Sequence, residues 1–319
     1  MFKFLNKNLI LQSILFIGLL GYSVFLIFNG LEFYIPEGAP VLSTSLHALA
    51  INYPLLMQIV ITCVLLLQLA LLQYFFGKND FSESFQLSPS IWYLAYLAGS
   101  GGLTHLSPLF FINLLIIILL LLNANYDMAS IKSRVLVSGI LIGIAFFIDI
   151  VCALLIVFII IALIVNRFSK AKDILVSIFG FTIPVIYFFC YYLFTDQLSI
   201  ITDSFLQLRF FGFYHSFPAL SVINIIGFIL LVVMLLYLMV LLRIIFANKL
   251  IVMRRRLITL DVMTIVLFFI IMLSPDHYPG VLLYLFIPVS VYCSLISQYK
   301  RHWLLHDIVM LTVLILLCL

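Results

Sequence analysis

Charged residues are scarce in this sequence of 319 residues: 9% are Asp, Glu, Lys or Arg, whereas 66% are hydrophobic. Soluble domains are roughly 45–50% apolar and about 25% charged. A soluble fold could not withdraw this much apolar surface from water, so lipid must be the solvent for most of the chain. The composition predicts an all-α integral membrane protein with many spans and excludes an ordinary soluble domain.

The sequence also lacks the short motifs of several common chemistries. Its five cysteines lie within apolar runs and form no CxxC pair, which argues against a disulfide framework or a zinc site. It contains neither a glycine-rich phosphate-binding loop nor a nucleophile elbow. The net charge of +4 does not point to nucleic acid, because basic residues in membrane proteins reflect topology. No nucleic-acid partner and no organic cofactor are therefore expected.

Long apolar runs are abundant and define the expected spans. A helix needs about 20 apolar residues to cross the hydrocarbon core. Two tracts, 91–123 and 135–166, are too long for one crossing, and we interpret each as a short helical hairpin. The remaining tracts are single spans: 9–29, 53–76, 174–194, 221–243, 258–274, 281–297 and 306–319. The expected total is eleven transmembrane helices in one domain, residues 1–319.

Basic residues on both sides of the tract 135–166 indicate that it crosses the membrane twice. The flanking bases are Lys132, Arg134, Arg167, Lys170 and Lys172. Because Lys and Arg concentrate in cytoplasmic loops, both flanks are expected in the cytoplasm. The tip of this hairpin is then expected near 147–152, with Asp149 on the outer side.

The same rule orients the whole chain. With a cytoplasmic N-terminus, all but one of the sixteen Lys and Arg residues fall on the inner side, and the exception is Arg209. The tract 91–123 is expected to fold back at GSGGLTHLSP, where small residues and Pro108 end one helix and start another. The longest outer loops are expected at 30–52 and 195–220. Because the hairpin arms are short, their turns should dip below the outer surface, which is tolerated only where they contact protein or a water-filled cavity.

The polar residues that could carry chemistry gather on the predicted outer side. The candidates are Glu32, Glu37, His105, Asp149, Arg209, His215 and His277. Each also has a structural interpretation: Asp149 could cap the second hairpin arm, Glu32 and Glu37 could be solvated loop acids, and Arg209 could anchor an interfacial segment. The histidines could be hydrogen-bonded loop residues. No metal-ligand spacing is present, so no metal site is predicted.

This order of features resembles the GT-C class of membrane glycosyltransferases, which use polyprenyl-phosphate-linked sugars. In that class a first span leads into an outer loop with a catalytic carboxylate, and a hairpin written roughly G-x-x-x-G-(L/I)-A follows. Here Glu32 or Glu37 follows the first span, and the stretch GILIGIA at 139–145 leads to Asp149. The resemblance covers about residues 9–195, so 1–195 would be a GT-C-like half and 196–319 additional C-terminal helices. The chain departs from the class in having neither an Asp-Glu pair in this loop nor a C-terminal soluble domain.

The resemblance implies a site at the outer face of the bacterial inner membrane. Glu32, or Glu37 in its place, would be the general base on an acceptor hydroxyl. Arg209 would hold the phosphate of the lipid-linked sugar donor, with His215 or a divalent cation assisting. Asp149 would orient a sugar hydroxyl or a cation. The other expected substrate-binding residues are His105 and His277.

Two other function classes stay open. A non-enzymatic membrane subunit or scaffold of a cell-envelope assembly would use the outer polar residues to hold partner membrane proteins. A lipid or solute transporter is the third class, although no charge lies firmly at mid-helix and no inverted repeat is evident.

Two further stretches, LSPLFFINLL at 106–115 and LFIPVSVY at 285–292, resemble a family of polytopic membrane proteins of Bacteroidota. Because that family has no assigned activity, the resemblance implies kinship rather than function.

Overall fold

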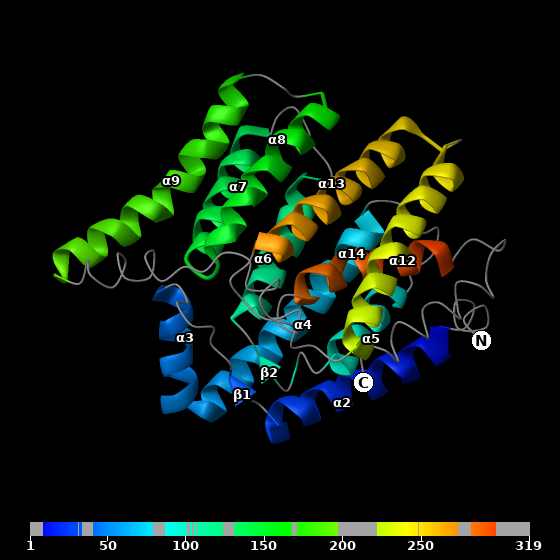
Figure 1. The fold of residues 1–319 in the computed structure, drawn as a ribbon, viewed down its shortest axis with the longest axis horizontal. Coiled ribbons are helices and arrows are strands. Elements are labelled where there is room, and N and C mark those ends of the chain that lie inside the picture. Colours follow the sequence, from blue (N-terminus) through cyan, green and yellow to red (C-terminus); the bar gives the residue numbers. More distant parts are fainter. Residues whose placement is uncertain are drawn as a thin grey trace.

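The structure, a computed structural model, is almost entirely helical in the residues that it describes (Figure 1). These residues are 9–30, 32–33, 41–78, 87–100, 103, 105–106, 108–123, 131–167, 171–196, 222–247, 249–273 and 282–297. They form eleven α-helices, one 3₁₀ helix and two strands of two residues each. The predicted all-α class is therefore confirmed for this part of the chain.

Among the described residues, five helices are long and apolar enough to cross a membrane. They are α2 (Leu9–Gly30), α4 (Pro54–Lys78), α9 (Ala171–Phe194), α12 (Val222–Phe246) and α13 (Ile251–Leu273). The 25 residues of α4 extend over about 37 Å, more than the roughly 30 Å of a hydrocarbon core. The outward side chains of these five helices include many large exposed apolar groups, which fits lipid as the solvent. Each of these helices overlaps a predicted span, although α13 begins at Ile251 and its span at 258.

Shorter helices account for both hairpins and for the span predicted at 281–297. They are α5 (Ser88–Gly99), α6 (Leu109–Asn123), α7 (Ile131–Phe146), α8 (Leu155–Val165) and α14 (Leu283–Ser297). With 15 residues each, α6 and α14 extend over only about 22 Å. These helices are shorter than the hydrocarbon core is thick.

Both long apolar tracts are interrupted where the sequence predicts. The first is broken between Gly99 and Leu109, across the segment GSGGLTHLSP. The second is broken after Phe146, and the chain resumes as the 3₁₀ helix η1 (Ile150–Leu154), which runs directly into α8. Figure 1 shows α7 and α8 side by side, as the hairpin interpretation requires.

The segment 30–52, expected to be an outer loop, instead contains helix α3 (Val41–Asn52). Leu42 and Leu46 pack against the core and Ala50 is buried, so residues four positions apart form one inward stripe. This stripe is too short to count as a span, which is why an assignment by span length missed it. The last predicted span, 306–319, lies outside the described residues.

The helix ends lie in two opposite layers (Figure 1). One layer contains the end of α2, the start of α4, the turn between α7 and η1 and the end of α9. The other layer contains the end of α4, the start of α7 and the turn between α12 and α13. Every Lys and Arg within the described ranges belongs to this second layer: Lys78, Lys132, Arg134, Arg167, Lys172, Arg243, Lys249, Arg254, Arg255 and Arg256. We call it the basic layer.

Three glycines hold the second hairpin against α9. A Cβ atom at Gly139 would collide with the backbone carbonyl oxygen of Ser177, and one at Gly143 would lie 2.7 Å from the carbonyl oxygen of Phe181. A Cβ atom at Gly180, on α9, would collide with the carbonyl oxygen of Leu136 in the same way. The GILIGIA stretch thus lets two helix backbones approach closely, the usual role of paired small residues between membrane helices.

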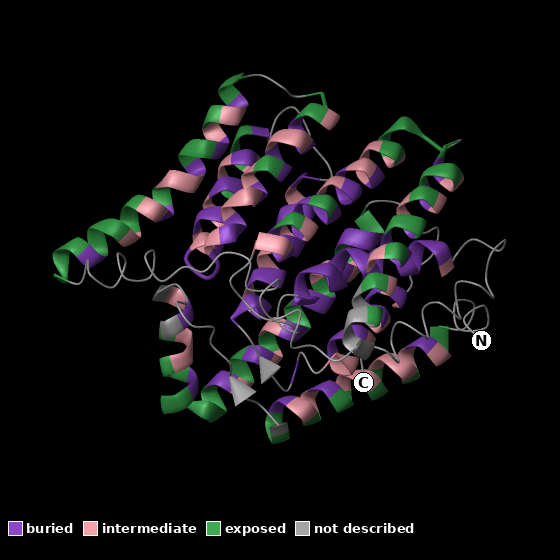
Figure 2. Ribbon diagram, viewed as in Figure 1, coloured by how far each residue is buried: buried purple, intermediate pink, exposed green. Residues whose placement is uncertain are grey.

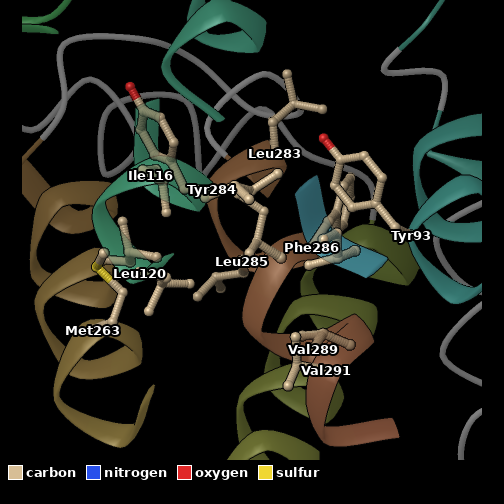
Figure 3. Packing of buried hydrophobic residues seen from close by; sticks show 14 of the residues in the cluster. Tyr93, Ile116, Leu120, Met263, Leu283, Tyr284, Leu285, Phe286, Val289 and Val291 are labelled. Atoms are coloured by element: carbon tan, nitrogen blue, oxygen red, sulfur yellow. The ribbon is translucent and has the colours of Figure 1, made fainter. Parts of the chain in front are cut away.

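Helix α14 forms the centre of the core. All its residues from Leu283 to Ile296 are buried, whereas α2 and α9 are largely exposed (Figure 2). It packs against α5, α6, α12 and α13. Figure 3 shows Tyr284 and Leu285 of α14 among Tyr93 of α5, Ile116 of α6 and Met263 of α13. The hydrogen-bonded polar groups of α14 therefore have their partners inside the protein, whereas the buried Oγ of Ser294 has no partner among the described residues.

Candidate functional site

Two of the predicted site residues lie opposite each other in the short parallel pairing of β1 (Glu32–Phe33) with β2 (His105–Leu106). The register places Glu32 against His105. Strand β1 follows α2, and β2 lies within the break between α5 and α6. Paired strands are about 4.8 Å apart, so a carboxylate and an imidazole are carried on neighbouring backbone positions. The fold thus joins the end of the first span to the break in the first hairpin.

The third predicted residue in the described part, Asp149, caps η1. Its backbone is extended, with φ −144° and ψ 117°, and its Oδ1 accepts a hydrogen bond from the backbone N–H of Val151 at 3.0 Å. Only 3% of the residue is exposed. The cap satisfies an N–H group that would otherwise be unpaired at the helix start. This is the structural role that the sequence left open beside ligand binding.

Asp149 also joins the hairpin tip to α14. The hydroxyl of Tyr284, in the first turn of α14, donates a hydrogen bond to its Oδ2 at 3.0 Å. The Sγ atom of Cys152 lies 3.8 Å from the same hydroxyl. Tyr284 and Cys152 are both buried. Both carboxylate oxygens of Asp149 are thus engaged by protein groups.

A second buried chain of hydrogen bonds joins the first hairpin to α14. The Nδ2 of Asn113 donates to the carbonyl oxygen of Leu283 at 3.1 Å and to the hydroxyl of Tyr93 at 3.3 Å. Tyr93 in turn donates to Oε1 of Gln68 at 2.8 Å, and Nε2 of Gln68 donates to the carbonyl oxygen of Phe110 at 2.8 Å. The chain therefore connects α4, α5, α6 and α14.

The first turn of α14 is thus the meeting point of both hairpins. Leu283 receives a hydrogen bond from α6, and Tyr284 donates one to the tip between α7 and η1. We call Asn113, Asp149, Leu283 and Tyr284 the α14 junction. The Oδ1 of Asn113 is buried and accepts no hydrogen bond from the described residues, so it could accept one from a water molecule or a ligand hydroxyl. The junction fixes backbone positions inside the bundle.

The sequence pointed to Asp149 but not to the other members of the two hydrogen-bond networks at α14. Tyr284 lies in an apolar run, and a tyrosine is common in membrane helices. Asn113 and Gln68 were visible as polar residues within apolar helices, a recognised signal for contacts between helices. No spacing rule, however, indicates which distant helix such a residue will contact.

The other predicted site residues are Glu37, Arg209, His215 and His277, and they lie outside the described residues. Within the described part of the chain, no group of three or more His, Cys, Asp or Glu residues is arranged to hold a metal ion.

A separate polar cluster lies near the basic layer. The Oδ2 of Asp261, on α13, lies 2.9 Å from Nε of Arg243 on α12, and its Oδ1 accepts a hydrogen bond from the hydroxyl of Tyr292 on α14 at 2.8 Å. The hydroxyl of Tyr292 lies 3.1 Å from that of Thr264. The side chain of Asp261 is 1% exposed, so its charge is held between three helices. The side chain of Arg243 is 57% exposed, so only the Asp261 end of the ion pair is enclosed, and loss of Arg243 would leave the buried carboxylate without its charged partner.

The fold defines the class of this protein: a helical membrane protein, with five helices among the described residues that are long and apolar enough to cross a bilayer. No protein-family model, curated protein or solved structure matches the chain. A particular function must therefore be argued from the residues themselves.

Proposed function

We propose that this chain is a membrane glycosyltransferase of the GT-C type, which takes a sugar from a polyprenyl-phosphate-linked donor at the outer face of the bacterial inner membrane. The main support is the register that places Glu32 opposite His105. Glutamate and histidine are both residue types that move protons as general bases, and the register brings these two backbone positions together. Both residues follow the ends of apolar helices on the side opposite the basic layer.

The orientation belongs to the same proposal. Because Lys and Arg concentrate on the cytoplasmic side, the basic layer lies in the cytoplasm, and so does the N-terminus before α2. The pairing of Glu32 with His105 then faces the outer side, as does the tip at Asp149. The proposed topology keeps the eleven spans, including 306–319.

The proposed reaction assigns Glu32 as general base, with Glu37 as the alternative. Its carboxylate takes the proton of an acceptor hydroxyl, and the hydroxyl oxygen bonds to the anomeric carbon of the donor sugar. The bond from that carbon to the phosphate oxygen breaks, and polyprenyl phosphate leaves with the electron pair. Arg209 stabilises the charge on this phosphate. His105 orients the carboxylate of Glu32.

The remaining residues would contact the substrates. His215 and His277 bind the donor, and a divalent cation could assist at the phosphate. Asp149 already accepts hydrogen bonds from Val151 and Tyr284, so a contact with a sugar hydroxyl would be added to these. Each carboxylate oxygen has two lone pairs, which leaves room for that contact.

The decisive experiment is turnover of radiolabelled undecaprenyl-phosphate glucose and mannose by the purified protein in lipid nanodiscs. Removal of the base in Glu32→Gln should lower the rate about 100-fold or more. The matched control is Asp196→Asn, which removes an acidic residue just after α9 and suits the left-handed backbone there, φ 53°. Full activity in Glu32→Gln would exclude this base. No turnover by the unaltered protein with either donor would count against the proposal.

The enclosure of Asp149 favours the second candidate function, a non-enzymatic membrane subunit of a cell-envelope assembly. Both of its oxygens bond to protein groups, as in a side chain that maintains the fold. Under this alternative, Glu32→Gln would leave cellular function unchanged. Variants of the α14 junction would reduce cellular function only to the extent that they destabilise the protein.

A further inference from the structure

The turn between α12 and α13 carries the excess positive charge of the chain. From residue 243 to residue 261 there are five basic residues and one acidic residue, which gives +4. The remaining eleven basic and eleven acidic residues cancel, so the net charge of +4 equals that of residues 243–261. We call this segment, which includes the adjoining ends of α12 and α13, the α12–α13 turn. The basic residues are Arg243, Lys249, Arg254, Arg255 and Arg256, and the acidic residue is Asp261.

Backbone hydrogen bonds hold the described residues of the α12–α13 turn. The backbone N–H of Lys249 donates to the carbonyl oxygen of Phe246 at 3.0 Å, and that of Arg254 donates to the carbonyl oxygen of Leu250 at 3.1 Å. Arg243 is bound to Asp261 across the two helices, and this contact holds α12 and α13 together beside the turn. The fold therefore sets the backbone positions of Lys249 and Arg254 and the contact between Arg243 and Asp261.

Three of the other basic residues have no counter-charge among the described residues. Lys249, Arg254 and Arg255 form no ion pair with a carboxylate of the described residues. They do not serve the stability of α13 either, because cations near the start of a helix oppose its macrodipole. A negatively charged partner would supply the missing counter-charge and would also offset the unfavourable interaction of these cations with the macrodipole of α13.

Large apolar side chains surround these charges. Ile244 is 69% exposed and Leu250 72% exposed, and Ile251 and Val252 are exposed as well. A soluble anion would contact the basic residues alone and make no use of the apolar side chains beside them. An anionic phospholipid matches both, since its headgroup carries the negative charge and its acyl chains are apolar.

We propose that the α12–α13 turn is a binding site for an anionic phospholipid, with the headgroup phosphate at Lys249, Arg254 and Arg255 and the acyl chains along Ile244 and Ile251. The binding site does not depend on the glycosyltransferase proposal. It is more specific than the general preference of Lys and Arg for one side of the membrane, because it assigns lipid binding to one turn of the basic layer.

The test measures lipid binding by native mass spectrometry of the full chain with phosphatidylglycerol, and with phosphatidylcholine for comparison. The variant K249Q/R254Q/R255Q should bind phosphatidylglycerol at least about tenfold more weakly. The control K78Q/K132Q/K172Q removes three exposed lysines elsewhere in the basic layer and should bind as the unaltered protein does. The charge-retaining variant K249R/R254K/R255K should also bind, which would attribute the loss in K249Q/R254Q/R255Q to the missing charge.

Three results would overturn the proposal. The first is equal binding of phosphatidylglycerol and phosphatidylcholine by the unaltered protein. The second is an equal loss of binding in the control, which would assign the attraction to the basic layer as a whole. The third is stabilisation by inorganic phosphate, in a thermal unfolding assay, equal to that by phosphatidylglycerol, since the apolar side chains would then contribute nothing.

Discussion

The hydroxyl of Tyr284 donates a hydrogen bond to Oδ2 of Asp149, 3.0 Å away, although 135 residues separate the two in the chain. The bond joins the tip of one hairpin to the first turn of the most buried helix. Because both residues are shielded from solvent, no water can replace a lost partner without cost. The position of the hairpin tip therefore depends on this contact.

Tyr284→Phe should destabilise the protein by about 1–3 kcal/mol, because it removes a buried donor from a carboxylate while keeping the ring. The measurement is thermal unfolding in detergent. Tyr187→Phe is the matched control, since Tyr187 is 70% exposed on α9, and it should leave stability unchanged. Equal stability of the two variants would show that the bond contributes nothing.

Asp149→Asn separates the two roles of Asp149. Asparagine is a good N-cap, so the bond from the backbone of Val151 should survive. Its Nδ2 can donate to the hydroxyl of Tyr284 in place of the bond that Oδ2 accepts, so stability should fall by no more than about 1 kcal/mol. We expect cellular function to be lost nevertheless, because a negative charge kept at a membrane-embedded turn indicates a contact that needs the charge. Complementation in cells and thermal unfolding are measured together, with Asp149→Ser alongside. Full complementation by both variants at unchanged stability would leave capping as the only role.

Gly139→Ala should destabilise the protein by about 1–3 kcal/mol, because the added methyl group would collide with the backbone of α9 at Ser177. Gly18→Ala on α2 is the control. A Cβ atom there meets nothing within 4 Å, and alanine is the better helix former, so stability should stay constant or rise by up to about 1 kcal/mol. Thermal unfolding compares the two. A Gly139→Ala protein as stable as the control would mean that α7 and α9 are less closely packed than the structure shows.

Labelling of single cysteines tests the topology. In a background without the native cysteines, Lys132→Cys and Lys172→Cys should react with a membrane-impermeant maleimide only after the cytoplasmic side is exposed, because both lie in the basic layer. Asp196→Cys, just beyond α9, should react in intact cells. If Lys132→Cys and Lys172→Cys were labelled from opposite sides, the tract 135–166 would cross only once.

The sequence by itself determined the membrane class, most helices and both helix breaks. These are local properties: an apolar run long enough for a bilayer, a cluster of small residues with Pro108, and bases that flank 135–166 all act over one or two helix lengths. Hydropathy alone predicts a span that starts at 258, whereas α13 starts at Ile251. The difference arises because the helix includes Arg254 and Arg255, which precede the apolar run. Hydropathy alone also missed α3, whose inward stripe is formed by few residues.

Only the tertiary structure decided which residues meet. In a membrane helix the side facing lipid and the side facing protein are both apolar, so the sequence carries little sign of which face is buried or against which helix. The pairing of Glu32 with His105, the bond from Tyr284 to Asp149 and the close approach at Gly139 all depend on that choice. The sequence indicated a special role for Asp149, and helix packing selected Tyr284 as its partner.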